Sequence, residues 1–355
     1  MKYLFITSGI ALGHCTRDEA IINKLLEKDN EVVIACYSVS YNYFKDKFNV
    51  FRLSDVNFSC DGFKFNLIKN LIYNWNILFK WFINLVKLKL YIMKFKPDII
   101  VSDWEPIGLF FKKCVFMFNY DPEKVKNLDL NFSLKFQRYF LNLQYNLAKL
   151  FKKTTIVPSL EQMDRKYVKY VDLIVRKESS ELDSKENLMK KLNLKREPIL
   201  VMLGGSKFGI ELAKKIVNIA DNFDEEFIIF GYDVNKKNVK GFKFKDNFLE
   251  YLKVCKGVIT LAGFSTLSEV FFYKKPCLAF PIDNHLEQKS VLEDFKYFIM
   301  NKKISCSEEH LVYHIKNFLK NSDKLRMKMK DFKLKNGVEG VVRILDEEIQ
   351  RFSGK

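Results

Sequence analysis

Residues 263–288 combine a glycine, hydroxyl side chains and carboxylates at a spacing that suits several polar contacts. The first part is predicted to be a turn leading into a short helix, and it carries Gly263, Phe264, Ser265, Thr266 and Glu269. Backbone N–H groups at a helix N-terminus suit an anionic diphosphate, and a carboxylate one turn later suits a pair of neighbouring hydroxyl groups. A loop after the next predicted strand carries Asn284, His285, Glu287 and Gln288, which suit sugar hydroxyls.

Thr266 and Glu269 also fit a capping box, in which both side chains only satisfy N–H groups at the start of the helix. Capping gives no reason for polar side chains to cluster after the next strand as well. In open α/β sheets, ligands bind at the carboxyl edge of the strands. We therefore favour a binding site over a helix cap.

A second candidate loop, residues 8–20, follows the first predicted strand and reads SGIALGHCTRDEA. Gly9 and Gly13 permit a tight turn with positive φ. Thr16 is predicted to cap the next helix with Glu19 as its partner, which leaves His14 on the loop just before the helix. The positive end of the helix favours the neutral imidazole that a general base needs. The alternative is an ordinary surface histidine, although two of only four histidines fall in the two candidate loops.

A third candidate is Asp103, which follows a strand predicted at residues 98–102. A carboxylate at this strand end suits an orienting partner for a histidine base. Asp98 or Glu105 fits the same role, and Asp103 also fits a cap of the next helix.

Two segments in the second half of the chain add to the predicted anion site. A glycine turn after a strand lets backbone approach a phosphate, and here it consists of Gly204, Gly205 and Ser206. Phe244 and Lys245 lie on the loop before the helix that precedes Gly263. The alternative is that this segment only packs into the core, with Asp246 as the N-cap of the next helix.

These motifs resemble those of GT-B glycosyltransferases. The donor signature of the family 28-like group, which includes the peptidoglycan N-acetylglucosaminyltransferase, galactolipid synthases and UDP-glycosyltransferases, is matched by Gly263, Ser265, Thr266, Glu269, Pro276, Pro281, Glu287 and Gln288. Gly-x-x-x-Gly-His, ending at His14, is similar to their N-terminal glycine loop. The resemblance implies a hexosyltransferase-type enzyme whose active site lies in an interdomain cleft.

The resemblance also implies roles for the candidate residues. His14 would deprotonate an acceptor hydroxyl and Asp103 would orient it, while Gly9 and Gly13 would face a phosphate of the acceptor. The segment at Phe244 and Lys245 would hold uracil, so the expected donor is a UDP-sugar. One direct displacement would invert the anomeric centre. No Asp-x-Asp motif occurs, so we expect no metal-bound diphosphate and no cofactor, the nucleotide sugar being a substrate.

The composition bounds the class of protein. A length of 355 residues suggests two domains, and seven scattered cysteines without a CxxC pair favour reduced thiols in the cytoplasm and argue against a zinc site. The net charge of +17 invites an anionic partner, but no compact basic cluster or nucleic-acid motif is visible. We therefore expect no nucleic-acid binding. We also expect neither a transmembrane helix nor a signal peptide.

Apolar runs alternate with helix-length segments, which predicts an α/β protein with two Rossmann-like domains in tandem. The predicted divisions are an acceptor domain at 1–176, a linker at 177–197, a donor domain at 198–336 and a last helix at 337–355 that packs back on the first domain. Strands are predicted at 3–7, 31–35, 98–102, 114–118, 154–157, 172–175, 198–203, 226–230, 257–260 and 276–280. Helices are predicted at about 16–28, 66–95, 130–150, 208–221, 246–255, 266–274 and 287–296.

Residues 66–96 are aromatic and basic, without any acidic residue. On a helix, one line would hold Lys69, Lys80, Lys87 and Lys94, and an apolar face would hold Leu71, Trp75, Leu78, Phe82 and Leu85. This suits peripheral contact with an anionic membrane at its cytoplasmic face, or a helix packed on the sheet with a solvated lysine ridge. The expected acceptor is correspondingly a lipid or lipid-linked glycan, a soluble glycan, a small molecule or a protein.

Two other functions fit the same scaffold. One is a UDP-N-acetylglucosamine 2-epimerase-like enzyme, although the basic aromatic segment and the Gly-His loop fit it poorly. The other is a non-catalytic protein that binds nucleotide sugars or polyanions, in which His14 would be dispensable.

Overall fold

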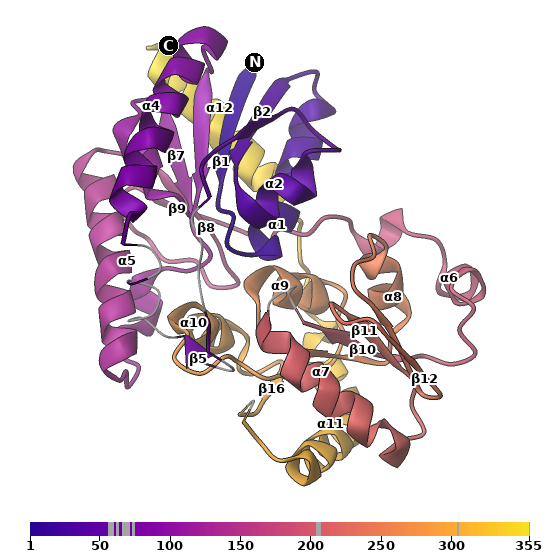
Figure 1. Cartoon of the computed structure of the whole chain (residues 1–355). Coiled ribbons are helices and arrows are strands. Elements are labelled where there is room, and N and C mark those ends of the chain that lie inside the picture. The colour runs from indigo at the N-terminus through magenta and orange to yellow at the C-terminus, as the bar shows by residue number, and fades with distance from the viewer. Residues whose placement is uncertain are drawn as a thin grey trace. The chain divides into compact units, whose positions relative to one another are not determined.

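The computed structural model describes residues 1–55, 60–61, 64–65, 72, 75–203, 207–303 and 305–354. The chain forms two compact units (Figure 1). Unit 1 comprises Met1–Ser59, Asn66–Arg176 and Lys335–Lys355, and unit 2 comprises Cys60–Phe65 and Lys177–Leu334.

Unit 1 is built on a parallel sheet of seven strands. They are β1 Lys2–Thr7, β2 Glu31–Cys36, β3 Val50–Arg52, β6 Ile99–Asp103, β7 Cys114–Met117, β8 Thr155–Pro158 and β9 Val168–Val171, in the order β3-β2-β1-β6-β7-β8-β9. Thr7 of β1 is in register with Asp103 of β6, which is in register with Met117 of β7. The segments that follow these three strands therefore begin side by side at the carboxyl edge of the sheet.

Five α-helices of unit 1 are described. They are α1 Leu12–Leu26, α2 Ser38–Phe44, α4 Ile77–Phe95, α5 Phe132–Leu150 and α12 Val338–Ser353. Apolar residues of α1 and α12 share one core with the strands, including Tyr3 and Phe5 of β1 and Val341 of α12. Figure 1 shows α12, in yellow, behind β1, and the Tyr3 hydroxyl of β1 donates to Asp346 of α12 at 3.2 Å. The last helix thus belongs to unit 1 although its sequence follows unit 2.

The strand predicted at 172–175 is wrong: the ninth strand is Val168–Val171. Leu173, Ile174 and Val175 are buried, which explains the strand-like pattern, but their backbone bonds go elsewhere. Gly337 N–H donates to the Leu173 carbonyl at 2.9 Å, and the Asn336 amide donates to the Val175 carbonyl. The helix predicted from residue 66 is described as α4 from Ile77, and residues 66–71 and 73–74 of that prediction lie outside the described residues.

Unit 2 has a second seven-stranded sheet, of order β12-β13-β11-β10-β14-β15-β16, which is parallel except for β12 against β13. Its strands are β10 Ile199–Met202, β11 Phe227–Phe230, β12 Val234–Lys236, β13 Val239–Phe242, β14 Gly257–Thr260, β15 Cys277–Ala279 and β16 Met300–Asn301. Two short strands, β4 Cys60–Asp61 and β5 Lys64–Phe65, pair separately. The helices are α6 Lys185–Lys191, α7 Lys207–Ile219, α8 Phe248–Val254, α9 Phe264–Phe272, α10 Leu286–Phe295 and α11 Glu308–Lys330.

Helix α11 has no counterpart among the predicted elements. The Ser307 side chain caps it by accepting a hydrogen bond from His310 N–H at 3.3 Å. Its buried side chains recur at helical spacing within a mostly polar sequence: Leu311, Ile315, Phe318, Ser322, Leu325 and Met329. This narrow buried stripe is the sequence pattern from which α11 could have been predicted.

Candidate active site

His14 and Asp103 meet at the carboxyl edge of the unit 1 sheet. The imidazole Nδ1 of His14 lies 3.1 Å from Oδ1 of Asp103, and both side chains are buried. A carboxylate accepts a hydrogen bond only from a protonated Nδ1, so this contact favours the tautomer in which Nε2 is the basic nitrogen. The pair therefore has the arrangement of a base and its orienting carboxylate.

The start of α1 differs from the prediction. The helix begins at Leu12, so His14 lies in its first turn and not on the preceding loop. Thr16 lies inside the helix and donates to the Gly13 carbonyl at 3.1 Å, so it is not the cap. Gly13 and Gly9 do not have the predicted positive φ.

Gly9 is required for a different reason. A Cβ atom built on Gly9 would lie 2.3 Å from the Tyr37 carbonyl oxygen. Such a distance is far below van der Waals contact, so any side chain here would displace the segment after β2. This glycine therefore permits the close approach of the loop after β1 to Tyr37.

The two alternatives to Asp103 have other partners. Asp98 accepts a hydrogen bond from Lys2 N–H at 2.8 Å, at the amino end of β6 and away from His14. Glu105 is buried and accepts from the Tyr37 hydroxyl at 2.5 Å. Asp103 is not the cap of the following 3₁₀ helix, Pro106–Phe110, whose N-cap residue is Glu105. Trp104, between the two acids, has a φ of 57°, an uncommon conformation for a bulky residue.

Four further polar residues surround the pair. Arg17 forms an ion pair with Asp103 and donates to the Asn119 side chain, and Thr7 donates to Asp18 Oδ2 at 2.5 Å. Burial alone would raise the pKa of Asp103, but the charges and hydrogen bonds of Arg17 and His14 hold that pKa below its usual range. Arg17 and Asp18 were missed in the sequence although they follow His14 by three and four residues, on the helical stripe continued by Ile21 and Leu25.

In unit 2, the predicted anion site gathers at the carboxyl edge of its sheet. Met202 of β10 is in register with Thr260 of β14, which is in register with Ala279 of β15. The segments after these strands carry, in turn, Gly204–Ser206, the start of α9 and the loop to α10. Gly204, Gly205 and Ser206 themselves lie outside the described residues.

Helix α9 begins at Phe264, with Gly263 as its N-cap and no side-chain cap. Ser265 and Thr266 thus lie in the first turn, whose N–H groups point away from the helix. Thr266 and Glu269 do not form the capping box that was the alternative, since the helix has already started at Phe264. The Glu269 side chain is buried, at 4% exposed. Positive φ occurs at Ala262, at 66°, and not at Gly263.

The loop before α10 is organised by its own polar groups. Gln288 is buried and its side-chain oxygen accepts from Ile282 N–H at 2.7 Å, so it holds the loop after Pro281. The His285 ring accepts from Gln288 N–H at 3.5 Å and caps α10, and burial lowers the pKa of His285. Asn284 has a φ of 60°, and Glu287 is half-buried in the first turn of α10.

Phe244 and Lys245 follow β13 at the same edge. The Phe244 side chain is 59% exposed, which excludes the core-packing alternative. The Lys245 Nζ lies 3.2 Å from the hydroxyl oxygen of Tyr251 and 4.4 Å from the centre of the Phe242 ring. The N-cap of α8 is Asn247 and not Asp246.

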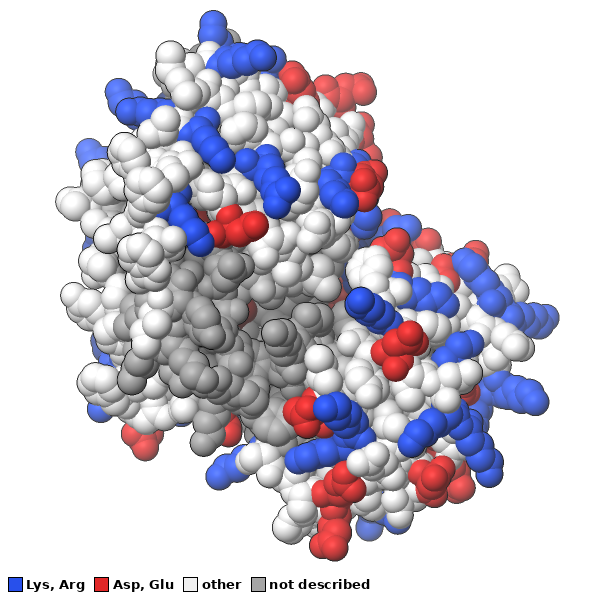
Figure 2. All heavy atoms as spheres, viewed as in Figure 1, with Lys and Arg blue, Asp and Glu red and all other residues white. Residues whose placement is uncertain are grey.

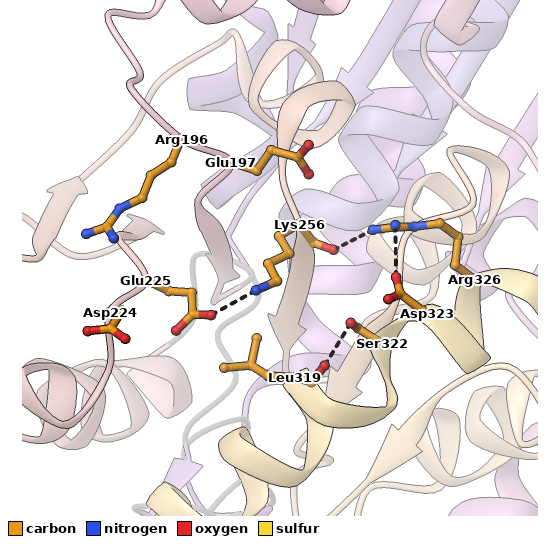
Figure 3. Close-up of a pocket in the computed structure, with 9 residues that line it drawn as sticks. All are labelled: Arg196, Glu197, Asp224, Glu225, Lys256, Leu319, Ser322, Asp323 and Arg326. Carbon is orange, nitrogen blue, oxygen red and sulfur yellow. Dashed lines mark hydrogen bonds and ion pairs between the residues drawn. The ribbon is translucent and has the colours of Figure 1, made fainter.

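A surface pocket lies at the opposite edge of this sheet (Figure 3). Glu197, Glu225 and Lys256 precede strands β10, β11 and β14 and line it. Four of its charges form two ion pairs, Lys256 with Glu225 at 2.9 Å and Arg326 with Asp323 at 3.2 Å. It holds none of the predicted site residues. Within the described ranges, no cluster of three or more His, Cys, Asp or Glu side chains is arranged to hold a metal ion.

Solved structures place the fold in a known class. The chain superposes on a glycosyltransferase of kitacinnamycin with a TM-score of 0.67 at 13% identity, covering 98% of this chain and 99% of that one. It superposes on MurG of Acinetobacter baumannii with a TM-score of 0.62 at 11% identity, covering 98% and 100%. The predicted GT-B fold, with two α/β units on parallel sheets, is confirmed.

The sequence pattern of glycosyl transferase family 1 matches residues 1–173 and 186–321, and the chain belongs to this family. The predicted glycosyltransferase class is thereby confirmed. A UDP-N-acetylglucosamine–N-acetylmuramyl-(pentapeptide) pyrophosphoryl-undecaprenol N-acetylglucosamine transferase of Thermosipho africanus is 26% identical over 87% of this chain and 90% of its own length. Uncharacterised glycosyltransferases of Methanosarcina mazei and Methanopyrus kandleri are 24% and 27% identical. The Methanosarcina mazei match covers 84% of both chains. The Methanopyrus kandleri match covers 40% of this chain and 46%, less than half, of that relative.

Proposed function

We propose that the chain transfers a sugar from a UDP-sugar to a hydroxyl acceptor with inversion at the anomeric carbon. The observation that carries this is the hydrogen-bond contact between His14 Nδ1 and Asp103, at 3.1 Å, which leaves Nε2 as the basic nitrogen. The acceptor oxygen forms a bond to the anomeric carbon as its proton passes to Nε2. The bond from that carbon to the diphosphate oxygen breaks, and its electron pair leaves with UDP.

Unit 2 supplies the donor site in this proposal. The first-turn N–H groups of α9, at Ser265 and Thr266, and the glycine turn at 204–206 stabilise the charge of the departing diphosphate. Glu269 holds the ribose hydroxyls, while Glu287 and the loop that Gln288 organises hold the sugar. Because these groups and the absence of an Asp-x-Asp motif point to N–H donors, we propose that transfer needs no metal ion and no cofactor.

Two observations support uridine as the base. The exposed Phe244 ring, beside Lys245, offers a flat apolar surface at the carboxyl edge of the sheet. The name of the Thermosipho africanus relative includes UDP-N-acetylglucosamine. The same name includes a pyrophosphoryl-undecaprenol acceptor, which supports a lipid-linked acceptor here.

Helix α4 supports an acceptor at a membrane surface. Its exposed side chains form one stripe, with Leu78, Phe79, Phe82, Leu90 and Met93 each more than 60% exposed. Its packed side consists of Asn84, Leu88 and Phe95, so the apolar stripe is not the side that packs on the sheet. Figure 2 shows basic side chains among uncharged ones over the upper left of this view, where α4 lies in Figure 1.

An exposed apolar stripe flanked by lysines suits the headgroup region of an anionic bilayer, so we propose peripheral contact at the cytoplasmic face. No described helix is long and apolar enough to cross a bilayer.

The test is transfer from each of a set of labelled nucleotide sugars to lipid-linked, soluble-glycan and small-molecule acceptors, with anomeric configuration read by NMR. The proposal expects one donor to give an inverted product that requires His14. A retained configuration would overturn the single displacement. Epimerised nucleotide sugar without an acceptor would instead support the epimerase-like alternative.

A further inference from the structure

A buried group of charges lies behind the His14–Asp103 pair. Arg17, Asp18 and Asp103 are each exposed by 2% or less. Isolated buried charges are costly, so such groups persist only when they are paired or neutralised. With His14 neutral and both acids ionised, the group would carry one uncompensated negative charge.

Arg17 and His14 share a single carboxylate oxygen. Arg17 Nη2 donates to Asp103 Oδ1, the same atom that the His14 Nδ1 contacts, and it lies 3.4 Å from that nitrogen. Asn119 accepts from the other end of the guanidinium and so fixes its orientation. A positive charge at this distance opposes the addition of a second proton to the imidazole.

Asp18 has one oxygen that is satisfied and one that is not. Thr7 donates to its Oδ2, while Asp18 Oδ1 and Asp103 Oδ2 are both buried without a hydrogen-bond partner among the described residues. Burial raises the pKa of Asp18 well above its usual range, and the neighbouring carboxyl group of Asp103 raises it further. Two carboxylates cannot hydrogen bond without a proton between them, so a proton held here would satisfy both groups.

We propose that Asp18 keeps a proton that it shares with Asp103, and that Arg17 and this acid together set the proton affinity of His14. Both are positioning residues, because they act through Asp103 and not on the reacting atoms. With Asp18 neutral, the charges of Arg17 and Asp103 cancel. The consequence for proton transfer at His14 rests on the proposed function, whereas the charge arrangement does not.

Other titratable groups lie near this cluster. Glu105, after β6, accepts from the Tyr37 hydroxyl, and burial raises its pKa to about 7. Cys15 and Cys36 lie near Asp18, and burial raises the pKa of both thiols. These groups are the same in the parent and in the Arg17 and Asp18 variants, so they do not alter the comparison between them. The Trp104 ring lies 6.1 Å from the imidazole centre and is uncharged, as is Asn119. When Arg17 is replaced, the largest change in charge near His14 is therefore the loss of the guanidinium beside Nδ1.

Histidine NMR of the full chain tests the proposal directly. With four histidines, the His14 signal is assigned by its loss in His14→Gln. Arg17→Met should raise the titration midpoint of His14 by about 1 to 3 pH units, while Arg17→Lys should leave it near the parent value. Asp18→Asn should also leave it near the parent value, because a neutral group replaces a neutral group.

An unchanged midpoint in Arg17→Met, or a fall of about 1 pH unit or more in Asp18→Asn, would overturn the proposal. If either variant fails to fold by circular dichroism, the infrared band of a protonated carboxyl in the parent, recorded at about pH 9, where Glu105 is ionised, decides for Asp18. Its absence contradicts the shared proton. The pH dependence of kcat/KM separates this proposal from the proposed function. If a variant shifts the NMR midpoint of His14 but not the pH–rate profile, the charge arrangement stands and His14 is not the base.

Discussion

The Tyr37 hydroxyl donates to Oε1 of Glu105 at 2.5 Å, and both side chains are buried at the carboxyl edge of the unit 1 sheet. Burial raises the pKa of Glu105 to about 7, although Tyr37 and His14 act in the opposite direction. The folded protein therefore binds a proton that the unfolded chain releases at about pH 4.5.

This acid makes stability depend on pH. Between about pH 4.5 and 7 the native state binds more protons at Glu105 than the unfolded state, so its contribution falls as pH rises, by about 3 kcal/mol in all. Glu105→Gln cannot ionise and removes the decline. Urea unfolding at pH 5 and pH 8 should show the variant gaining stability relative to the parent at pH 8. An equal difference at both pH values, as expected for a control such as Glu293→Gln, would refute the assignment.

His14→Ala should lower sugar transfer by about 10²- to 10⁴-fold, the usual worth of a general base. Nucleotide-sugar affinity should hardly change, because the donor residues belong to unit 2. His310→Ala, an exposed histidine on α11, is the matched control and should behave as the parent. Loss of transfer and donor binding together in His14→Ala would contradict a role as base.

Glu269→Ala should weaken nucleotide-sugar binding about tenfold or more, because a buried carboxylate that holds two hydroxyls contributes more than about 1 kcal/mol. Isothermal titration calorimetry gives the affinity, and Glu269→Gln keeps the shape if the alanine variant does not fold. Glu293→Ala on α10 serves as control. Unchanged affinity in both Glu269 variants would leave this residue a structural role only.

Two glycine substitutions should differ in their effect on the stability of the fold. Gly9→Ala should destabilise the protein by about 1–3 kcal/mol, because its Cβ would collide with the Tyr37 carbonyl. Gly263→Ala should fold normally, since no atom lies within 4 Å of its Cβ position and its φ is −67°. Thermal melts test both, and equal destabilisation would contradict the packing at Gly9.

The double variant Phe79→Ser, Phe82→Ser should reduce cosedimentation with anionic vesicles about tenfold or more, since each ring would lose its burial in the bilayer interface. Tyr313→Ser removes an exposed ring on α11 and should have no effect. Equal binding of the double variant and the parent would argue for a soluble acceptor.

Strand positions were predictable because buried parallel strands form short apolar runs with turn residues at their ends. The strand at 257–260 has its predicted bounds, and the polar residues at the strand ends, such as Asp103, fall at the carboxyl edges. The starts of α1 and α9 were not predictable from capping side chains. Helices α1 and α9 begin after Ala11 and Gly263, neither of which makes a side-chain cap, so Thr16 and Thr266 were misread.

The partners of His14 were harder to find than His14 itself. Arg17 and Asp18 look like surface charges, and such residues are rarely buried unless paired. Their pairing depends on Asp103 and Asn119, which lie 86 and 102 residues from Arg17 along the chain. Sequence spacing cannot reveal contacts of that range.

Thermal melts against nucleoside diphosphates and nucleotide sugars test the central claim most directly, because a ligand that binds only the folded state raises the melting temperature. We predict a selective rise with UDP and one UDP-sugar, and a smaller rise in Glu269→Ala. A cooperative melt that no nucleotide shifts would contradict the donor site and with it the proposed transfer reaction.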